Sequence, residues 1–190
     1  MSRELVWKIY NPSHNITKQS MLECIDRYEQ VGHCPDAVTK TDFYGNPTAP
    51  NDYMRIFIGS SGSANVRAAI LDKYWCSDFT VSSSWFQQYH TNDFHGWHCH
   101  GNCSISMSYL LELDDRKHST EFVDIERKDT FQLDVTEGDI IIFPSYVIHR
   151  SPLIKSDSRK TTVAININLG ELNIPRIDDI DPIFEGTFRE

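Results

Sequence analysis

The sequence predicts a mostly β protein with flanking helices (α+β). Its expected core is a double-stranded β-helix, or jelly-roll, with N-terminal helices packed on one sheet. Two observations lead to this fold class. Apolar residues recur at helical intervals only before residue 75, and from residue 79 onward several short strand-like runs follow one another closely. We expect a single domain over residues 1–190, with the core of its candidate site at about 79–169.

The first half of the chain combines helical and irregular stretches. Met21, Leu22 and Ile25 lie at helical spacing between a capping Thr17 and a terminating Gly32. Prolines, glycines and asparagines are dense after that helix and predict a long loop, either a functional lid or a surface excursion. We expect a strand over residues 5–10, a helix over 17–31 and the loop over 33–54. A short strand at 55–58, a turn at 59–62 and a second helix at 63–74 should follow.

The second half has the pattern of successive strands. Phe131, Leu133 and Val135 alternate with polar residues, as expected for a strand with one face in water. The expected strands cover residues 79–90, 104–113, 121–125, 131–135, 140–143 and 160–169. From Glu171 onward, prolines and aspartates predict an irregular tail laid over the domain.

Composition narrows the class of protein. The chain has 27 acidic and 18 basic residues, and its net charge of −9 opposes a phosphate backbone, so a nucleic-acid partner is not favoured. Its five cysteines form no recognisable disulfide framework, and residues 1–10 lack the apolar segment of a signal peptide, so we expect a cytoplasmic protein. No run approaches about 18 apolar residues, so we expect no membrane span. The sequence does not indicate the oligomeric state.

Three histidines form a candidate metal site. His98 and His100 are two residues apart on an extended segment, where side chains repeat with period two, so both point to the same side. His149 follows the β-branched run 140–143, and a sheet can fold it back beside them. Three imidazoles without a cysteine pair leave coordination positions free for water, oxygen or substrate, which favours a catalytic metal over a structural one.

Other metal-binding residue types lie near these histidines. Cys99 should point away from its histidine neighbours, and no second pair at zinc-finger spacing follows Cys103, so we expect both thiols to pack rather than bind zinc. His90, His95 and His118 fall in expected loops, where solvated side chains are commoner than ligands.

A candidate carboxylate-binding pair follows the third histidine. Arg159 and Thr161 are two residues apart at the start of the last expected strand and therefore face the same way. A guanidinium binds a carboxylate bidentately, and the hydroxyl adds a third donor. Taken without the histidines, an arginine at the start of a strand is more often a solvated surface charge than a ligand.

The order of these motifs carries a family resemblance. The motifs are Trp85, His98 with His100, the strand Ser106–Leu110, Phe143-Pro144-Ser145 before His149, and Arg159-x-Thr161. Their order resembles that of the 2-oxoglutarate and Fe(II)-dependent oxygenase superfamily, most closely its bacterial and phage members with a His-x-His metal segment. The resemblance covers about residues 79–168 and leaves the N-terminal helices unassigned.

The resemblance implies a function and a set of roles. Fe(II) and 2-oxoglutarate would be the cofactors, and a C–H bond would be hydroxylated with consumption of O2 and release of succinate and CO2. By position, His98 and His149 would be two facial iron ligands. Arg159 and Thr161 would bind the C5 carboxylate of 2-oxoglutarate, and Tyr109 would add a hydrogen bond to the co-substrate.

One departure from the family pattern leaves the third ligand open. The superfamily usually has Asp or Glu two residues after the first histidine, where this chain has His100. A neutral imidazole there leaves the iron site with one more positive charge. His100 is either the third ligand, or a residue that lines the pocket, or a neighbour of a ligating carboxylate such as Asp93 or Glu121.

Two other functions fit the same residues. The histidine order also resembles that of cupins, which include three-histidine iron enzymes that oxidise thiols without a keto-acid. The glutamate that cupins usually carry after the histidine pair is missing from residues 101–106, and a cupin would not need the arginine motif. The other alternative is a metal-binding module without turnover. For an enzyme, we expect a small-molecule or peptidyl substrate that the sequence does not identify, in a pocket bordered by Trp97.

Overall fold

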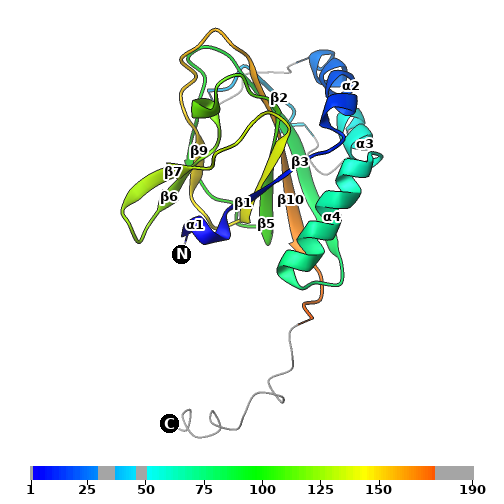
Figure 1. Cartoon of the computed structure of the whole chain (residues 1–190). Helices are drawn as coiled ribbons and strands as arrows, with labels where there is room; N and C mark the ends of the chain where they lie inside the picture. Colours follow the sequence, from blue (N-terminus) through cyan, green and yellow to red (C-terminus); the bar gives the residue numbers. More distant parts are fainter. Residues whose placement is uncertain (1, 30–36, 46–50, 174–190) are drawn as a thin grey trace, which may run out of the picture.

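The computed structural model describes residues 2–29, 37–45 and 51–173 (Figure 1). Its helices are α1 (Ser2–Leu5), α2 (His14–Asp26), α3 (Asp52–Ile58), α4 (Ser61–Tyr74) and the 3-10 helix η1 (Arg116–His118). Its strands are β1 (Trp7–Tyr10), β2 (Lys40–Thr41), β3 (Phe79–Tyr89), β4 (His95–His98), β5 (Ile105–Glu112), β6 (Glu121–Asp124), β7 (Asp129–Gln132), β8 (Asp139–Pro144), β9 (His149–Ser151) and β10 (Lys160–Leu169).

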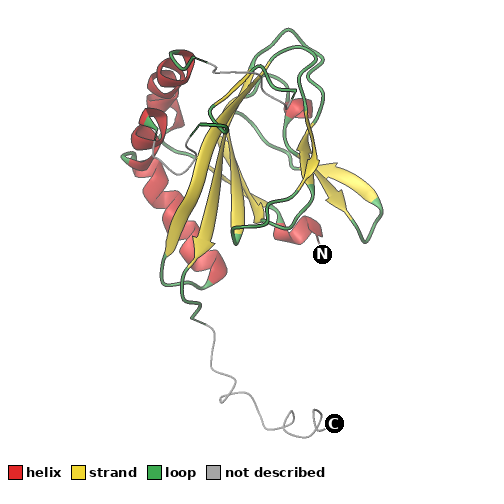
Figure 2. Cartoon of the chain, turned by 180° about the vertical axis from the view of Figure 1, so that it is seen from behind, coloured by secondary structure: helices red, strands yellow, loops and turns green. Residues whose placement is uncertain are grey.

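Two antiparallel sheets form the two walls of the molecule. The larger has the strand order β1-β8-β5-β10-β3-β2, and the smaller has the order β4-β9-β6-β7. Figure 2 shows the helices α2, α3 and α4 outside the larger sheet, on the side away from the smaller one. The predicted fold class, a mostly β jelly-roll with N-terminal helices on one sheet, is confirmed.

Apolar side chains join the helices to the outer face of the larger sheet. Met21 of α2 and Phe57 of α3 share one buried cluster with Val163, Ile165 and Ile167 of β10. Because successive side chains of a strand point to opposite faces, the residues between these three point into the space between the sheets. This alternation decides which residues of β10 can reach a site inside.

A second apolar cluster joins the two sheets across the interior. Phe122 of β6 is fully buried, and its ring centroid lies 5.1 Å from that of Phe143 of β8. Leu110 and Ile141 pack in the same cluster. The remaining interior space is lined by histidines and other polar residues.

The segment 55–58 is helical, so the predicted strand there is wrong. Tyr53, Met54 and Phe57 are buried on the inner face of α3, and their spacing of one and four residues fits a helix. The β-favouring residues in the segment obscured this short helical face. Likewise, the turn expected at 59–62 contains the first residues of α4.

Other boundaries differ by a few residues. The helix expected over 17–31 begins at His14 and ends at Asp26. The strand expected over 131–135 is β7, which ends at Gln132 and pairs with β6. Parts of the 33–54 loop, and the tail beyond residue 173, lie outside the described residues.

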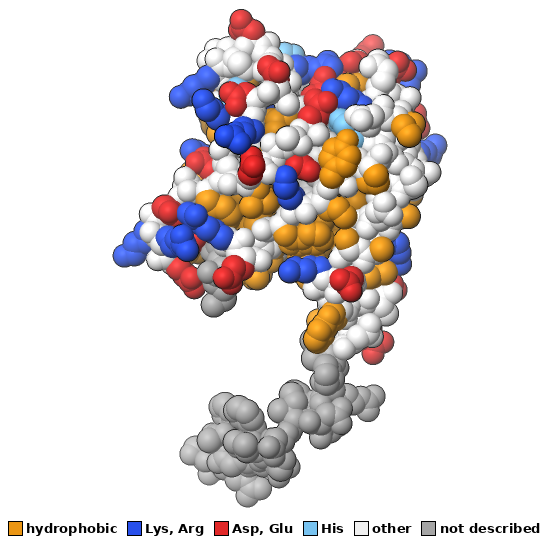
Figure 3. All heavy atoms as spheres, in the orientation of Figure 1, with side chains coloured by type: hydrophobic (Ala, Val, Ile, Leu, Met, Phe, Trp, Pro, Cys, Tyr) orange, Lys and Arg blue, Asp and Glu red, His pale blue; other side chains and the backbone are white. Residues whose placement is uncertain are grey.

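The face seen in Figure 3 carries acidic and basic side chains side by side rather than in separate patches. This mixture is typical of a solvated surface, and it presents no basic stripe for a phosphate backbone on that face. Within the described ranges, no helix is long and apolar enough to cross a membrane.

Gly138 offers a test of the turn that leads into β8. Its φ is +93°, and an added Cβ would lie 2.6 Å from Cε2 of Tyr10 and 3.0 Å from Cγ of His14. Gly138→Ala should therefore lower the free energy of unfolding by about 1–3 kcal/mol, measured by urea denaturation. Gly96→Ala is the matched control, because nothing lies within 4 Å of its added Cβ. Equal losses for the two variants would contradict the strain at Gly138.

Candidate metal centre and active-site cavity

The structure brings the three predicted histidines together. His98 ends β4 and is the register partner of His149 at the start of β9. Their ring centroids lie 4.2 Å apart, and that of His100 lies 5.1 Å from that of His149. One ligand atom from each ring lies within 4.8 Å of the other two, which is close enough for all three to hold one ion.

Each of the three rings is oriented by a hydrogen bond at Nδ1. The Nδ1 atoms of His98 and His149 lie 2.8 and 2.9 Å from the carbonyl oxygens of Gly96 and Val147. That of His100 lies 2.8 Å from Oδ1 of Asn166. Carbonyl and amide oxygens only accept hydrogen bonds, so each Nδ1 carries a proton, and the neutral form of each ring presents the lone pair of Nε2. Histidines that bind metals are usually held in this way.

Burial keeps two of the imidazoles neutral. It lowers the pKa of His149 to about 3, with a further contribution from the neighbouring His98. Burial also lowers the pKa of His100, although the hydrogen bond to Asn166 acts in the opposite direction. Only a neutral imidazole can bind a metal, so both rings are ready to do so at pH 7.

The two carboxylates considered as alternative ligands are bound elsewhere. Asp93 accepts hydrogen bonds from the Thr39 hydroxyl and from the N–H of His90, at 2.9 Å in the second case. Glu121 accepts one from Nε of Arg150 at 2.5 Å. Among the described residues, no acidic side chain lines the cavity around the three histidines.

The histidines lie between an inner and an outer cavity. Both cavities are lined by Trp85, Gln87, His95, His98 and His100. The inner cavity continues to His149 and Lys160 between the two sheets. The outer cavity has a volume of about 520 Å³, and Phe43 and Tyr44 are among the residues that line it.

Lys160 is a basic residue of the inner cavity that sequence reasoning missed. Its Nζ donates to Oγ of Ser151 at 2.7 Å and lies 4.8 Å from the centre of the Tyr89 ring. In the part of the chain that the structure describes, no acidic side chain forms an ion pair with it, and complete burial lowers its pKa to about 7. A buried ammonium without an anion is costly, which points to a ligand that supplies the negative charge.

Known structures share this fold. At 12% identity, a viral collagen prolyl hydroxylase from Paramecium bursaria Chlorella virus-1, solved with 2-oxoglutarate, superposes with a TM-score of 0.60 over 86% of this chain and 95% of its own. HygX from Streptomyces hygroscopicus, with nickel, 2-oxoglutarate and hygromycin B bound, gives 0.61 at 10% identity over 86% and 82%. The α-ketoglutarate-dependent epimerase SnoN gives 0.63 at 10% identity over 98% and 87%.

The chain has the fold of the 2-oxoglutarate and Fe(II)-dependent oxygenases. No protein-family model matches the sequence, and no curated protein is significantly similar to it. Since identities of this size establish the fold alone, the roles of individual residues in this oxygenase-like fold depend on the geometry of the chain itself.

The structure does not bring Arg159, Thr161 or Tyr109 to the cavity, contrary to the sequence prediction. Nε and Nη2 of Arg159 both donate to Glu112 at 2.8 Å, and the Thr161 hydroxyl donates to the same carboxylate at 2.5 Å. The Tyr109 hydroxyl bonds to Asn11 at 3.0 Å on the helix side of the sheet. All three side chains lie on the outer face of the larger sheet because strand residues alternate, and the basic residue of this segment that lines the inner cavity is Lys160.

Trp97 does not border the cavity either. Its side chain is 42% exposed, and Cζ of Arg150 lies 4.3 Å from its ring centre. It precedes His98 on β4 and therefore points to the opposite face. Trp85, whose ring centroid lies 5.8 Å from that of His100, lines the cavity instead.

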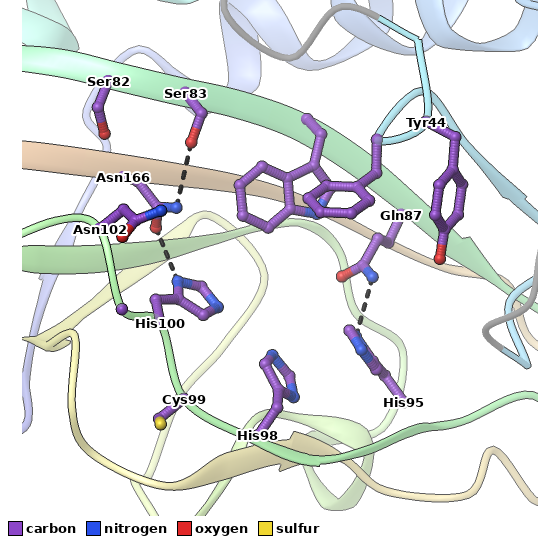
Figure 4. A pocket seen from close by; sticks show the side chains of 13 residues that line it. Tyr44, Ser82, Ser83, Gln87, His95, His98, Cys99, His100, Asn102 and Asn166 are labelled. Atoms are coloured by element: carbon purple, nitrogen blue, oxygen red, sulfur yellow. Dashed lines mark hydrogen bonds between the residues drawn. The ribbon is translucent and has the colours of Figure 1, made fainter.

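Two histidines expected to be solvated are not. The ring of His95 stacks on that of His98 with centroids 4.1 Å apart, and Nε2 of Gln87 lies 3.0 Å from its Nδ1 (Figure 4). His118 is buried in η1. The two-residue periodicity could not place His95, because the pairing of β4 with β9 is irregular between His95 and His98.

Alanine variants should separate the metal-binding imidazoles from their neighbour. His98→Ala, His100→Ala and His149→Ala should each weaken metal binding by more than about tenfold, measured by anaerobic Co(II) titration. His95→Ala is the matched control, since its ring contacts His98 but lies outside the group of three. Its affinity should stay close to that of the unmodified protein. A loss at His95 as large as that at His100 would refute the three-histidine centre.

Arg159 should contribute to stability rather than to ligand binding. Arg159→Ala breaks contacts with Glu112 and Asp26, and it should lower the free energy of unfolding by about 1–2 kcal/mol, a range that allows for the partial exposure of the side chain. Lys160→Met removes a buried cation that has no acidic partner among the described residues, so it should leave stability unchanged or raise it. Urea denaturation of both variants, at pH 6, checks this contrast, and the reverse order of stability would contradict it.

Proposed function

We propose that this protein is a non-haem Fe(II) and 2-oxoglutarate-dependent oxygenase. The single observation that carries the proposal is the buried Lys160, which lines the same inner cavity as the three imidazoles and has no acidic partner among the described residues. A carboxylate ligand would give this ammonium group the anionic partner that it lacks among the described residues. 2-Oxoglutarate has one end that chelates a metal and a second carboxylate that suits an ammonium group.

The residues present fit the metal as well. His98, His100 and His149 would hold it through Nε2, because the hydrogen bonds at Nδ1 leave those lone pairs free. Three neutral imidazoles leave the ion's double positive charge undiminished, which strengthens the attraction of a dianionic co-substrate. When bound, iron and the keto-acid supply the oxidation of a substrate C–H bond by O2, with release of succinate and CO2.

The protein's own contribution is to bind, orient and exclude water. Lys160 would pair with the distal carboxylate, while Ser151 and the face of Tyr89 fix the direction of its ammonium group. Phe143, whose ring centroid lies 4.6 Å from that of His149, keeps water from the inner side of the metal centre. A dry surrounding strengthens both ionic contacts.

A second function is favoured by one specific residue. His100 stands where the oxygenases usually have a carboxylate, and three-histidine shells also occur in metal dioxygenases that act on thiols without a keto-acid. A thiol substrate without a carboxylate would leave the buried cation Lys160 without a partner. We therefore rank this function second. A metal-binding module without turnover would need neither the cation nor the outer cavity.

Anaerobic titration of the Fe(II) protein with 2-oxoglutarate tests the proposal. A metal-to-ligand charge-transfer band should appear. Lys160→Met should weaken the binding of 2-oxoglutarate by about 100-fold and leave the affinity for Fe(II) unchanged. Arg159→Ala is the control and should bind 2-oxoglutarate as the unmodified protein does, since its side chain lies on the outer face. A band that appears equally in Lys160→Met, or no band together with thiol-dependent O2 uptake, would contradict the proposal.

The same titration has a predictable pH dependence. The pKa of Lys160 is about 7 without ligand, and a bound carboxylate would raise it. The dissociation constant should therefore be constant below pH 7 and rise above it, by up to about tenfold per pH unit, as the free lysine loses its proton. Lys160→Met should show no such rise. A flat profile in the unmodified protein would exclude Lys160 as the anchor.

A further inference from the structure

The outer cavity has one aromatic wall. It consists of Phe43, Tyr44 and Trp85, with ring centroids 4.9 Å apart between Phe43 and Trp85 and 5.2 Å apart between Phe43 and Tyr44. Phe43 and Tyr44 are 40% and 48% exposed although they are large and apolar. Figure 4 shows Tyr44 of this wall together with His98 and His100, which line the same cavity. Exposed aromatic rings that gather in a cavity mark a binding surface.

Buried polar contacts hold this wall in place. The Asp42 carboxylate, directly before the two exposed rings, accepts hydrogen bonds from the N–H of Phe86 and from the Tyr53 hydroxyl, both at 2.8 Å. The Thr41 hydroxyl donates to the carbonyl of Phe86 at 2.7 Å. The turn that carries the rings is thereby fixed to β3. A rigid aromatic surface loses little conformational entropy when a ligand packs on it.

The rest of the cavity is polar but uncharged. No Asp, Glu, Lys or Arg lines it among the described residues. Ser83 and Asn166 are bonded to each other at 3.1 Å, and Asn166 also orients His100. Ser82 and Asn102 line the cavity too, and within the described ranges no hydrogen bond occupies the Ser82 hydroxyl or the Asn102 amide. Both groups remain available to a ligand.

We propose, on the basis of the function proposed above, that the substrate is a neutral, hydroxyl-bearing ring of the sugar type. A charged substrate would lose its hydration in a cavity without a countercharge. A purely apolar substrate would cover Ser82 and Asn102 and leave them unpaired. A sugar ring avoids both costs, because its C–H face would pack on the aromatic wall and its hydroxyl groups would bond to Ser82 and Asn102. Packed on the exposed rings of Phe43 and Tyr44, such a ring lies in the cavity that His98 and His100 also line.

Saturation-transfer NMR on the Zn(II)-loaded protein, with and without 2-oxoglutarate, tests this substrate class. The probes are methyl β-glucoside and methyl β-galactoside. Glucosamine and methyl glucuronide serve as cationic and anionic counterparts, and N-acetylprolinamide represents a peptidyl ring. At least one neutral glycoside should show transfer to its ring protons. The charged sugars and the proline derivative should show much weaker transfer or none.

Variants locate the binding. Phe43→Ala should weaken the binding of the glycoside about three- to tenfold, because it removes a ring contact but leaves the buried Trp85 in place. Ser82→Ala should weaken it less. Tyr146→Ala is the matched control, since this ring is 66% exposed and lines neither cavity, and it should bind as the unmodified protein does.

Three outcomes would overturn the substrate class: no transfer to any neutral glycoside, equal transfer to the charged sugars or to N-acetylprolinamide, or an unchanged affinity in Phe43→Ala. The 2-oxoglutarate titration is independent of these outcomes. A charge-transfer band without glycoside binding would refute the sugar-type substrate and leave the oxygenase standing. Glycoside binding that depends on Phe43, without any band, would refute the oxygenase and leave a carbohydrate-binding cavity.

Discussion

The antiparallel pairing of β4 with β9 is the contact on which the site depends. It sets His98 directly opposite His149, although 50 residues separate them in the chain. β6 pairs with the other edge of β9, and Phe122 is the register partner of His149 there. The same strand is thus held to the histidine segment on one side and to the apolar interior on the other. A shift of one residue in either pairing would turn the imidazole of His149 out of the cavity.

The alternation of side chains along β10 places stabilising residues on its outer face and a cavity-lining residue on its inner face. Thr161 and Arg159, two residues before it, bind Glu112 on the helix side of the sheet. Ionic partners and partial exposure there make the desolvation cost of a charged group small. Lys160 faces the other way into full burial, and its pKa falls from 10.5 to about 7. Between those values the unfolded chain holds more protons than the folded one, so the cost of burying this lysine is relieved only as the pH rises through that range. Folding alone does not favour an ammonium group at this position, whereas an anionic ligand would.

Sequence patterns predicted the fold class and the three histidines because both depend on local periodicity. The strands of the larger sheet and the His98–His100 pair follow from residues a few positions apart. Long-range packing decided the rest. The helix at 52–58 depends on its contacts with the core, and the phase of β10 depends on which face the helices cover. The pattern around residue 160 allowed either phase, since the chain has a basic side chain at both Arg159 and Lys160.

The charges of the interior form one consistent set. Four imidazoles, the Lys160 ammonium group and Arg150, which is paired with Glu121, line the inner cavity, and no carboxylate lines it among the described residues. A bound divalent cation would add two positive charges, and a ligand would then have to supply the negative charge that balances them. A dicarboxylate keto-acid would match this demand at both of its ends, while a thiol substrate without a carboxylate would bind the metal and leave Lys160 unpaired. With His100 as the third ligand, the proposed site would depend more strongly on an anionic co-substrate than a site with a carboxylate at that position.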